Sequence, residues 1–132
     1  MAKTPWVVAG MAMSVLVGFV FLKKPADAST HPTPRPGITA AKVVPTSLIP
    51  RTLGASEAYA AAREAAATLD GMYCHCDCSK HASHRSLLTC FESDHGAYCD
   101  VCMGEAMVAS GMAKQGKSLT EIRTAIDRQF GS

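Results

Sequence analysis

Cys74-His75-Cys76-Asp77-Cys78 places three thiols on alternate residues, and the organisation of the chain can be worked out from this stretch. All six cysteines of the chain lie between residues 74 and 102. The later residues of this span that have metal-binding side chains are His81, His84, Cys90, His95, Cys99 and Cys102. This clustering is the most informative feature of the sequence, and it predicts a cysteine-rich loop at the centre of a small domain.

The length of the chain limits how such a domain is stabilised. The 132 residues suffice for one domain. Residues 55–132 number fewer than about 80, a size at which a hydrophobic core alone gives little stability. Domains of this size usually need disulfides or a bound metal. Six cysteines fit either solution, so their number alone does not choose between the two.

Charge is unevenly distributed along the chain. Residues 1–54 carry six basic residues and one acidic residue, a net charge of +5. Residues 55–132 carry seven basic and ten acidic residues, a net charge of −3. Because phosphate binding needs a basic surface, the mildly acidic domain argues against nucleic acid as a partner.

The N-terminal part has the features of a targeting segment. Residues 5–22 are apolar and uncharged, long for the core of a signal peptide and just sufficient to span a membrane. Ala26-Asp27-Ala28 is a suitable cleavage site. We expect residues 1–28 to be a signal peptide or an N-terminal membrane anchor. Lys23-Lys24 favours a cytoplasmic C-terminus under the positive-inside rule, but the Pro/Thr-rich stretch that follows suits an exported domain. We therefore expect an extracytoplasmic protein, secreted or anchored by its N-terminus.

Residues 29–54 contain five prolines among serine, threonine and alanine. Proline removes backbone donors and blocks helix formation. This composition predicts an extended, semi-stiff linker in front of the domain. His31, within this segment, is expected to be an ordinary solvated residue.

The remaining residues, 55–132, have helical patterns. Residues 56–70 are alanine-rich, begin at a possible cap, Ser56, and are followed by Gly71. A short helix is predicted over 83–91 and a longer one over 99–115. Ser118-Leu119-Thr120-Glu121 is a capping box that opens a fourth helix. Since no stretch alternates like a strand, the sequence predicts an all-α, four-helix domain around the cysteine-rich loop.

The spacing of the thiols favours a shared ion over internal disulfides. In an extended chain Cys74, Cys76 and Cys78 point to one side, with His75 and Asp77 on the other. A disulfide within Cys-x-Cys is strained, whereas thiolates that share a soft metal need close spacing. The second unit, Cys99-x-x-Cys102, lies on one face at the start of a helix, where the helix dipole stabilises thiolate.

Crowded thiolates select Cu(I), while zinc is held tetrahedrally by four of them. Zinc sites usually combine two Cys-x-x-Cys units, and this chain has one. More than four clustered sulfurs favour a shared Cu(I) centre, with zinc as the second choice. The predicted metal ligands are Cys74, Cys76, Cys78, Cys90, Cys99, Cys102, His81 and His84. His95 and His75 are weaker candidates.

Other interpretations of the cysteines stay open. They could form structural disulfides, take part in thiol–disulfide exchange, or belong to a zinc- or disulfide-stapled interaction module. Cys90, between Leu87 and Phe91, could be ordinary core packing. The sequence has no Ser/His/Asp arrangement, paired carboxylates or phosphate loop, which argues against a hydrolase, and no catalytic residue is predicted.

Three blocks of sequence resemble a known family. They are MYCHCDC at 72–78, HRSLLTCF at 84–91 and HGAYCDVC at 95–102, followed by matching residues at 116–118 and 121–127. The pattern resembles the PCYCGC-motif, or CYCXC, family of small exported bacterial proteins, some of which are selenoproteins. Tyr73, His75 and Asp77 stand where that family usually has proline, tyrosine and glycine. The chain also lacks the lipid-bearing cysteine of many relatives.

The resemblance implies a secreted or membrane-tethered helical domain whose six cysteines function together, with His84 and His95 as lesser matches. Selenocysteine in relatives points to redox or soft-metal chemistry. From the residues and the resemblance we expect an exported protein that holds Cu(I) in a thiolate cluster for buffering, delivery or detoxification. Its expected partners are the metal ion, a metal-transfer or redox partner protein, and the membrane through the N-terminal segment. A thiol–disulfide redox protein is the alternative.

Overall fold

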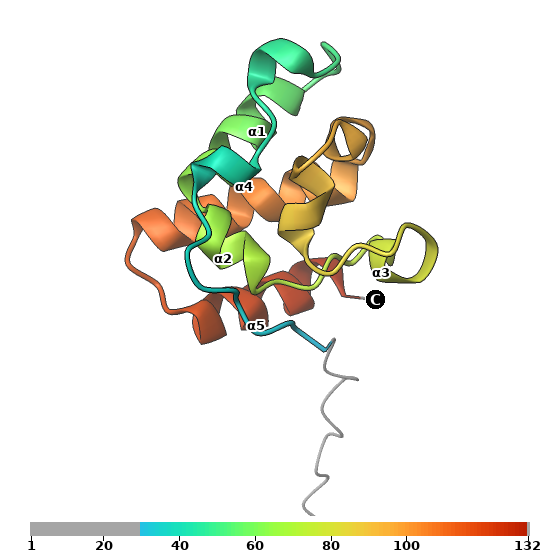
Figure 1. Cartoon of the computed structure of the whole chain (residues 1–132). Coiled ribbons are helices and arrows are strands. Elements are labelled where there is room, and N and C mark those ends of the chain that lie inside the picture. Colours follow the sequence, from blue (N-terminus) through green and yellow to red (C-terminus); the bar gives the residue numbers. More distant parts are fainter. Residues whose placement is uncertain (1–29, 132) are drawn as a thin grey trace, which may run out of the picture.

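A computed structural model describes residues 30–131, and within them the secondary structure is entirely helical (Figure 1). The α-helices are α1 (Ala55–Glu64), α2 (Ala66–Asp70), α3 (Cys78–His81), α4 (Asp100–Lys114) and α5 (Leu119–Phe130). The short 3-10 helices are η1 (Ala40–Lys42), η2 (Thr46–Leu48), η3 (Leu87–Phe91) and η4 (His95–Tyr98). The all-α prediction is confirmed.

The signal peptide or anchor expected over residues 1–28 lies outside the described residues. Among residues 30–131, none of the helices combines the length and the apolar composition that crossing a bilayer requires.

The predicted helices are found with some changes of boundary. The first is broken at Ala65 into α1 and α2. The second is the shorter 3-10 helix η3, and a further 3-10 helix, η4, lies before α4. The capping box at the start of α5 is complete, because Ser118 Oγ accepts from the backbone N–H of Glu121 and the Glu121 carboxylate accepts from that of Ser118.

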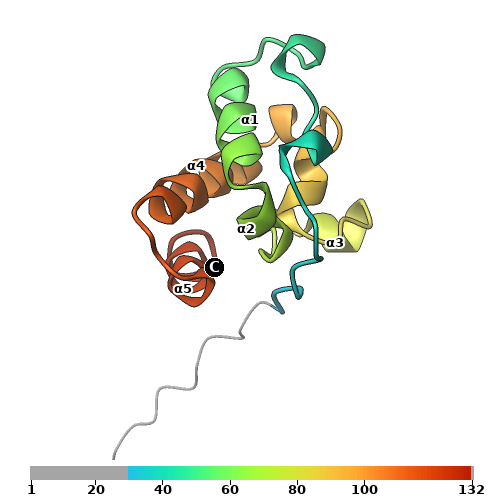
Figure 2. The same cartoon turned by 60° about the vertical axis from the view of Figure 1, so that its left-hand side comes forward.

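Small side chains let the helices approach closely. α1 crosses α4, and α5 packs against the other side of α4 (Figures 1 and 2). Ala58 and Ala62 of α1 and Ala106 of α4 are completely buried. Ile122 and Ile126 bury the inner face of α5. The core therefore sits around α4, whose N-terminal end carries two of the cysteines.

The segment in front of α1 packs on the helices, contrary to the extended linker predicted for residues 29–54. Val43 is buried, and the backbone N–H of Val44 donates to the carbonyl of Phe91 at 3.0 Å. His31, expected to be solvated, accepts from the backbone N–H of Tyr73 at 2.9 Å through Nδ1. Its Nε2 donates to Asp127 at 3.0 Å. These contacts make residues 30–54 part of the folded unit.

Asp70 ties this segment to the cysteine-rich loop. Its side chain is fully buried at the end of α2, and it accepts from the backbone and guanidinium of Arg35 at 2.6 Å. Arg85 donates to the same carboxylate at 3.1 Å. Burial alone would raise the pKa of Asp70, but the hydrogen bonds and charges of the two arginines outweigh it and lower the pKa. The carboxylate thus stays ionised. It joins the segment before α1, the end of α2 and the stretch that contains Arg85, and it lies shortly before Cys74 in the chain.

Candidate metal centre

The six cysteines come from four neighbouring parts of the fold. Cys74 and Cys76 lie in the loop after α2, and Cys78 is the first residue of α3. Cys90 lies in η3. Cys99 caps the N-terminus of α4, and Cys102 lies in its first turn.

The sulfur atoms of these residues converge on one place. Cys74 Sγ lies 3.2 Å from Cys76 Sγ and 3.3 Å from Cys102 Sγ. Cys76 Sγ lies 2.7 Å from Cys78 Sγ and 3.4 Å from Cys102 Sγ. The Cys90 thiol reaches Cys74 Sγ at 3.8 Å. None of the six forms a disulfide in the structure. The triple-thiol run and Cys102 of the later pair therefore meet.

The backbone of the triple-thiol run brings its sulfurs together without being extended throughout. Asp77 adopts the left-handed conformation with φ of 59°, and α3 begins at the next residue. The carbonyl of Met72 accepts from the backbone N–H of Leu87 at 2.9 Å, which holds the loop against η3. The His75 ring contacts the carboxylates of Glu105 and Asp127.

Four groups of side chains have ligand atoms that all lie within 4.8 Å of one another. They are Cys74/Cys78/Cys90/Cys102, Cys78/His84/Cys90/His95, Cys76/Cys99/Cys102 and Cys76/Cys78/His81. Four tetrahedral ligands about 2.3 Å from a metal ion lie roughly 3.8 Å apart, so these spacings fit coordination of one ion by each four-residue group. The groups also overlap. Cys78 belongs to three of them, and Cys76, Cys90 and Cys102 each belong to two.

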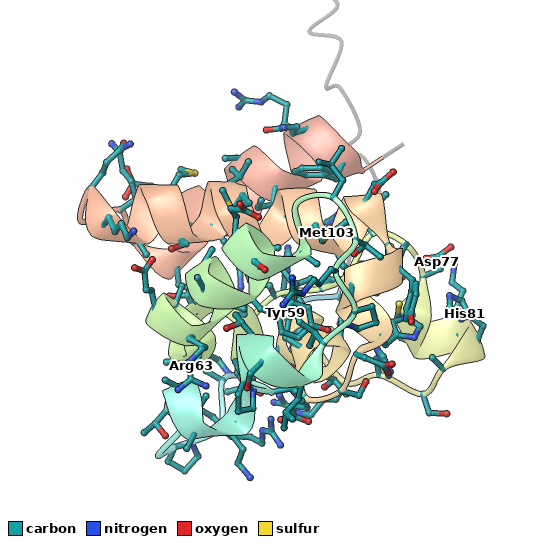
Figure 3. The ribbon with its side chains drawn as sticks, turned by 90° about the horizontal axis from the view of Figure 1, so that it is seen from above. Tyr59, Arg63, Asp77, His81 and Met103 are labelled. Atoms are coloured by element: carbon teal, nitrogen blue, oxygen red, sulfur yellow. The ribbon has the colours of Figure 1, made fainter. Side chains whose placement is uncertain are left out.

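The structure also places the histidines beside the sulfurs. His84 Nδ1 lies 3.2 Å from Cys90 Sγ, and His95 Nε2 lies 3.3 Å from Cys78 Sγ. Burial, and then the charge of His95, lower the pKa of His84, which favours the neutral form that binds metals. His81 is exposed, and its Nε2 lies 3.2 Å from the carbonyl of Cys76 (Figure 3). His95, only a weaker candidate from sequence, is therefore as well placed as His84.

The cysteines of the cluster differ in the direction in which their pKa is shifted. Hydrogen bonds from Cys102 and then Cys90 lower the pKa of Cys74. The contact with Cys74 raises the pKa of Cys102, because a thiol beside a thiolate loses its proton less easily. The cluster thus favours one thiolate, at Cys74, held by neighbouring thiols. A thiolate is the form that binds soft metal ions.

Glu105 is a buried carboxyl beside the cluster that sequence analysis missed. The backbone N–H of His75 donates to its Oε1 at 3.0 Å, and the His75 ring contacts the same oxygen. Its Oε2 has no partner among the described residues. Burial, and then the charge of Cys74, raise the pKa of Glu105 to about 9. Its position three residues after Cys102, on the same helical face, was the available signal.

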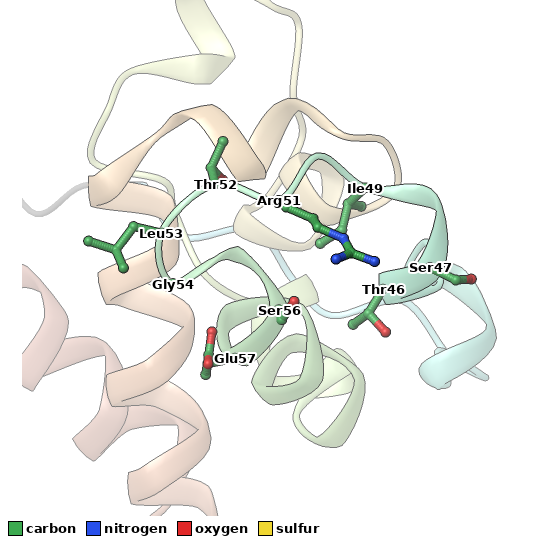
Figure 4. A pocket seen from close by; sticks show the side chains of 9 residues that line it. All are labelled: Thr46, Ser47, Ile49, Arg51, Thr52, Leu53, Gly54, Ser56 and Glu57. Atoms are coloured by element: carbon green, nitrogen blue, oxygen red, sulfur yellow. The ribbon is translucent and has the colours of Figure 1, made fainter.

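A surface hollow elsewhere on the molecule does not overlap the sulfurs. It lies beside the start of α1 and is lined by residues such as Thr46, Arg51 and Glu57 (Figure 4). Its lining contains no cysteine or histidine. The candidate site is therefore the sulfur cluster and its histidines, and not this hollow.

Comparison with known protein families now identifies the chain. A family model described as "Protein of unknown function with PCYCGC motif" matches residues 35–132. The chain belongs to this PCYCGC-motif family. The resemblance to the PCYCGC-motif family is confirmed, whereas export and the link to selenoproteins stay predictions. The matched region begins at Arg35, within the segment expected to be a linker. No curated protein and no solved structure matches the chain significantly.

The geometry explains how this member of the PCYCGC-motif family tolerates its departures from the motif. Asp77 replaces the glycine of the motif at a position with φ of 59°, a conformation that glycine adopts most easily and aspartate tolerates better than most residues. The Tyr73 hydroxyl, at the proline position, donates to Asp77 at 2.6 Å. His75, at the tyrosine position, contacts Glu105. The substituted side chains thus have partners of their own, and the three cysteines keep their places.

Proposed function

We propose that this protein binds Cu(I) in a cluster of shared thiolates outside the cytoplasm, and that it buffers, delivers or detoxifies the metal there. The observation that carries the proposal is the overlap of the four ligand groups at Cys76, Cys78, Cys90 and Cys102. A thiolate that belongs to two groups can bridge two ions. Soft, crowded thiolates favour Cu(I) among the common metals.

Burial supports the same conclusion. Cys74, Cys78, Cys90 and Cys102 have exposed fractions of 4% or less. A dry sulfur-lined site protects Cu(I) from water and oxidants and strengthens its bonds to thiolate. Cys74, the favoured thiolate, supplies the first negative charge for an incoming cation.

The test is anaerobic titration of the reduced, metal-free protein with Cu(I), followed by X-ray absorption at the copper edge. We expect more than one Cu(I) per chain, with sulfur as the predominant ligand. The contrary result is one zinc ion per chain, bound more tightly than copper. It would mean that Cys74, Cys78, Cys90 and Cys102 form a structural zinc site and that the Cu(I) assignment is wrong.

A thiol–disulfide redox protein is the second candidate, and the position of Cys99 favours it. Cys99 caps α4, is half-buried, and accepts from the backbone N–H of Cys102 at 3.5 Å. A cysteine at a helix N-terminus with a second cysteine three residues later is typical of exchanging dithiols. The test is the reduction potential of this pair. A value below about −300 mV would identify a structural disulfide instead of an exchanging one.

A further inference from the structure

The sulfur cluster is closed on most sides and open at its histidines. Four of its cysteines are buried, with α4 and η3 behind them. His84 and His95 are half-buried, and His81 is exposed on α3, at the outer edge of the molecule (Figure 3). The other partly open place is at Cys76 and Cys99, both half-buried.

The histidine side forms a coordination group of different chemistry from the buried one. Cys78, His84, Cys90 and His95 offer two sulfurs and two nitrogens within 4.8 Å of one another. Each ring lies against one of the two sulfurs, and the two rings meet edge to face with centroids 4.6 Å apart.

Two cysteines belong to both groups. Cys78 and Cys90 contribute to the mixed group and to the all-sulfur group with Cys74 and Cys102. An ion can therefore pass from one group to the other by exchanging two ligands while keeping two. Since thiolate holds Cu(I) more strongly than imidazole does, the all-sulfur group is the more stable position.

We propose that Cys78, His84, Cys90 and His95 form the exchange site through which Cu(I) enters and leaves the buried cluster. This rests on the proposed function, and it adds the route of the metal. Cu(I) first binds the two half-buried imidazoles and the sulfurs of Cys78 and Cys90, and each of these sulfurs that carries a proton releases it to water. It then moves inward to Cys74 and Cys102.

The inward step is a ligand exchange without electron transfer. Copper stays Cu(I) throughout. Its bonds to the ring nitrogens of His84 and His95 break, and bonds to the sulfurs of Cys74 and Cys102 form. A sulfur that is protonated releases its proton to water as it binds. Release of the metal is the reverse sequence.

The test follows the rate of loading of the full-length, reduced, metal-free chain. One equivalent of Cu(I) held by the coloured chelator bicinchoninate is mixed with the protein without oxygen, and the loss of chelator colour is recorded by stopped flow. For H84A/H95A we expect transfer slower by about tenfold or more, because losing even an outer partner of a metal ligand costs 10–100-fold. The amount of copper bound at equilibrium should not change, since the all-sulfur group is intact.

One further variant serves as the control. S79A alters an exposed residue of the same loop that belongs to none of the four ligand groups, and it should keep the wild-type rate within about twofold. A wild-type rate in H84A/H95A would overturn the proposal, and so would equal slowing by S79A.

A second measurement on the wild-type protein covers the case in which the double variant does not fold. Nitrogen-15 NMR of the imidazole rings is followed during titration with Cu(I) to saturation. The ring signals of His84 and His95 should shift, and that of His31 should not. Unshifted signals of both rings at saturation would overturn the proposal. If the wild-type protein takes up no Cu(I), the proposed function itself fails, which is a different result from unchanged rates.

Discussion

Replacing Asp70 by asparagine removes the charge that holds three parts of the fold together. The buried carboxylate accepts hydrogen bonds from the backbone and guanidinium of Arg35 and from the guanidinium of Arg85. Arg35 belongs to the segment before α1, and Arg85 to the stretch between α3 and η3. D70N therefore tests whether these contacts hold the segment and the cysteine-rich loop in place.

The expected loss of stability in D70N depends on how exposed the two arginines that bind Asp70 are. A hydrogen bond to a charged group contributes about 1.5–3 kcal/mol. The side chains of Arg35 and Arg85 are 39% and 37% exposed, so water and salt screen these bonds and solvate the arginines after the substitution. Asparagine also keeps one acceptor oxygen. We therefore expect a net loss of about 2 kcal/mol, well below the sum of the bonds. For a domain of this size that lowers Tm by roughly 8–16 °C.

The assay is thermal unfolding of both proteins, reduced and metal-free, followed by circular dichroism between pH 2 and pH 8. The lowered pKa of Asp70 means that its contribution is fully present above the unfolded pKa, about 3.9, and is lost as the pH falls through the folded pKa. The difference in Tm between wild type and D70N should be constant from about pH 5 to 8 and should shrink below about pH 4.

Asp94 provides the matched control, because it is an exposed aspartate on the same domain. D94N should leave the stability within about 0.5 kcal/mol of wild type. A D70N protein as stable as D94N at neutral pH would refute the reasoning, and so would a difference in Tm that persists unchanged to pH 2.

The remaining predictions concern two local features of the fold. An added Cβ at Gly96 would lie 2.9 Å from the carbonyl oxygen of Cys90, so G96A should cost about 1–3 kcal/mol in unfolding experiments. Its control is G111A, because nothing lies within 4 Å of the added Cβ there. Alanine in the middle of that helix should stabilise the protein by about 0.5–1 kcal/mol. Equal changes of stability in G96A and G111A would contradict the close packing at Gly96. S118A should cost about 1 kcal/mol, because the N-cap bond from Glu121 is lost. An unchanged denaturation midpoint in urea would show that this cap contributes nothing.

Features governed by local spacing could be predicted from the sequence. If the chain were extended, the alternation of Cys74, Cys76 and Cys78 would put their sulfurs on one side. The sulfurs do meet, although a left-handed Asp77 and the start of α3 interrupt the extended backbone. The capping box at Ser118 predicted the start of α5. Cys99 and Cys102 were expected at a helix start, and they are found at the N-cap and in the first turn of α4. In each case the determining contacts lie within a few residues.

Features governed by contacts between distant residues could not be predicted. Arg35 meets Asp70 across 35 positions, and no local pattern links a proline-rich segment to that carboxylate. The proline content therefore predicted a linker where the chain in fact packs on the helices. His95 likewise lies in η4, a short 3-10 helix without an apolar periodicity in the sequence, and only the fold brings it to Cys78. The assignment of the six cysteines, His81, His84 and His95 as metal ligands stays a prediction.

We propose that the six sulfurs, in their reduced form, together hold a soft metal. The most direct test is the metal and thiol content of the full-length protein purified without oxygen from cells supplied with copper. We expect more than one copper per chain, and six reactive thiols after the metal is removed by a chelator under denaturing conditions. Protein that contains no metal and has all six sulfurs paired in disulfides would contradict the account.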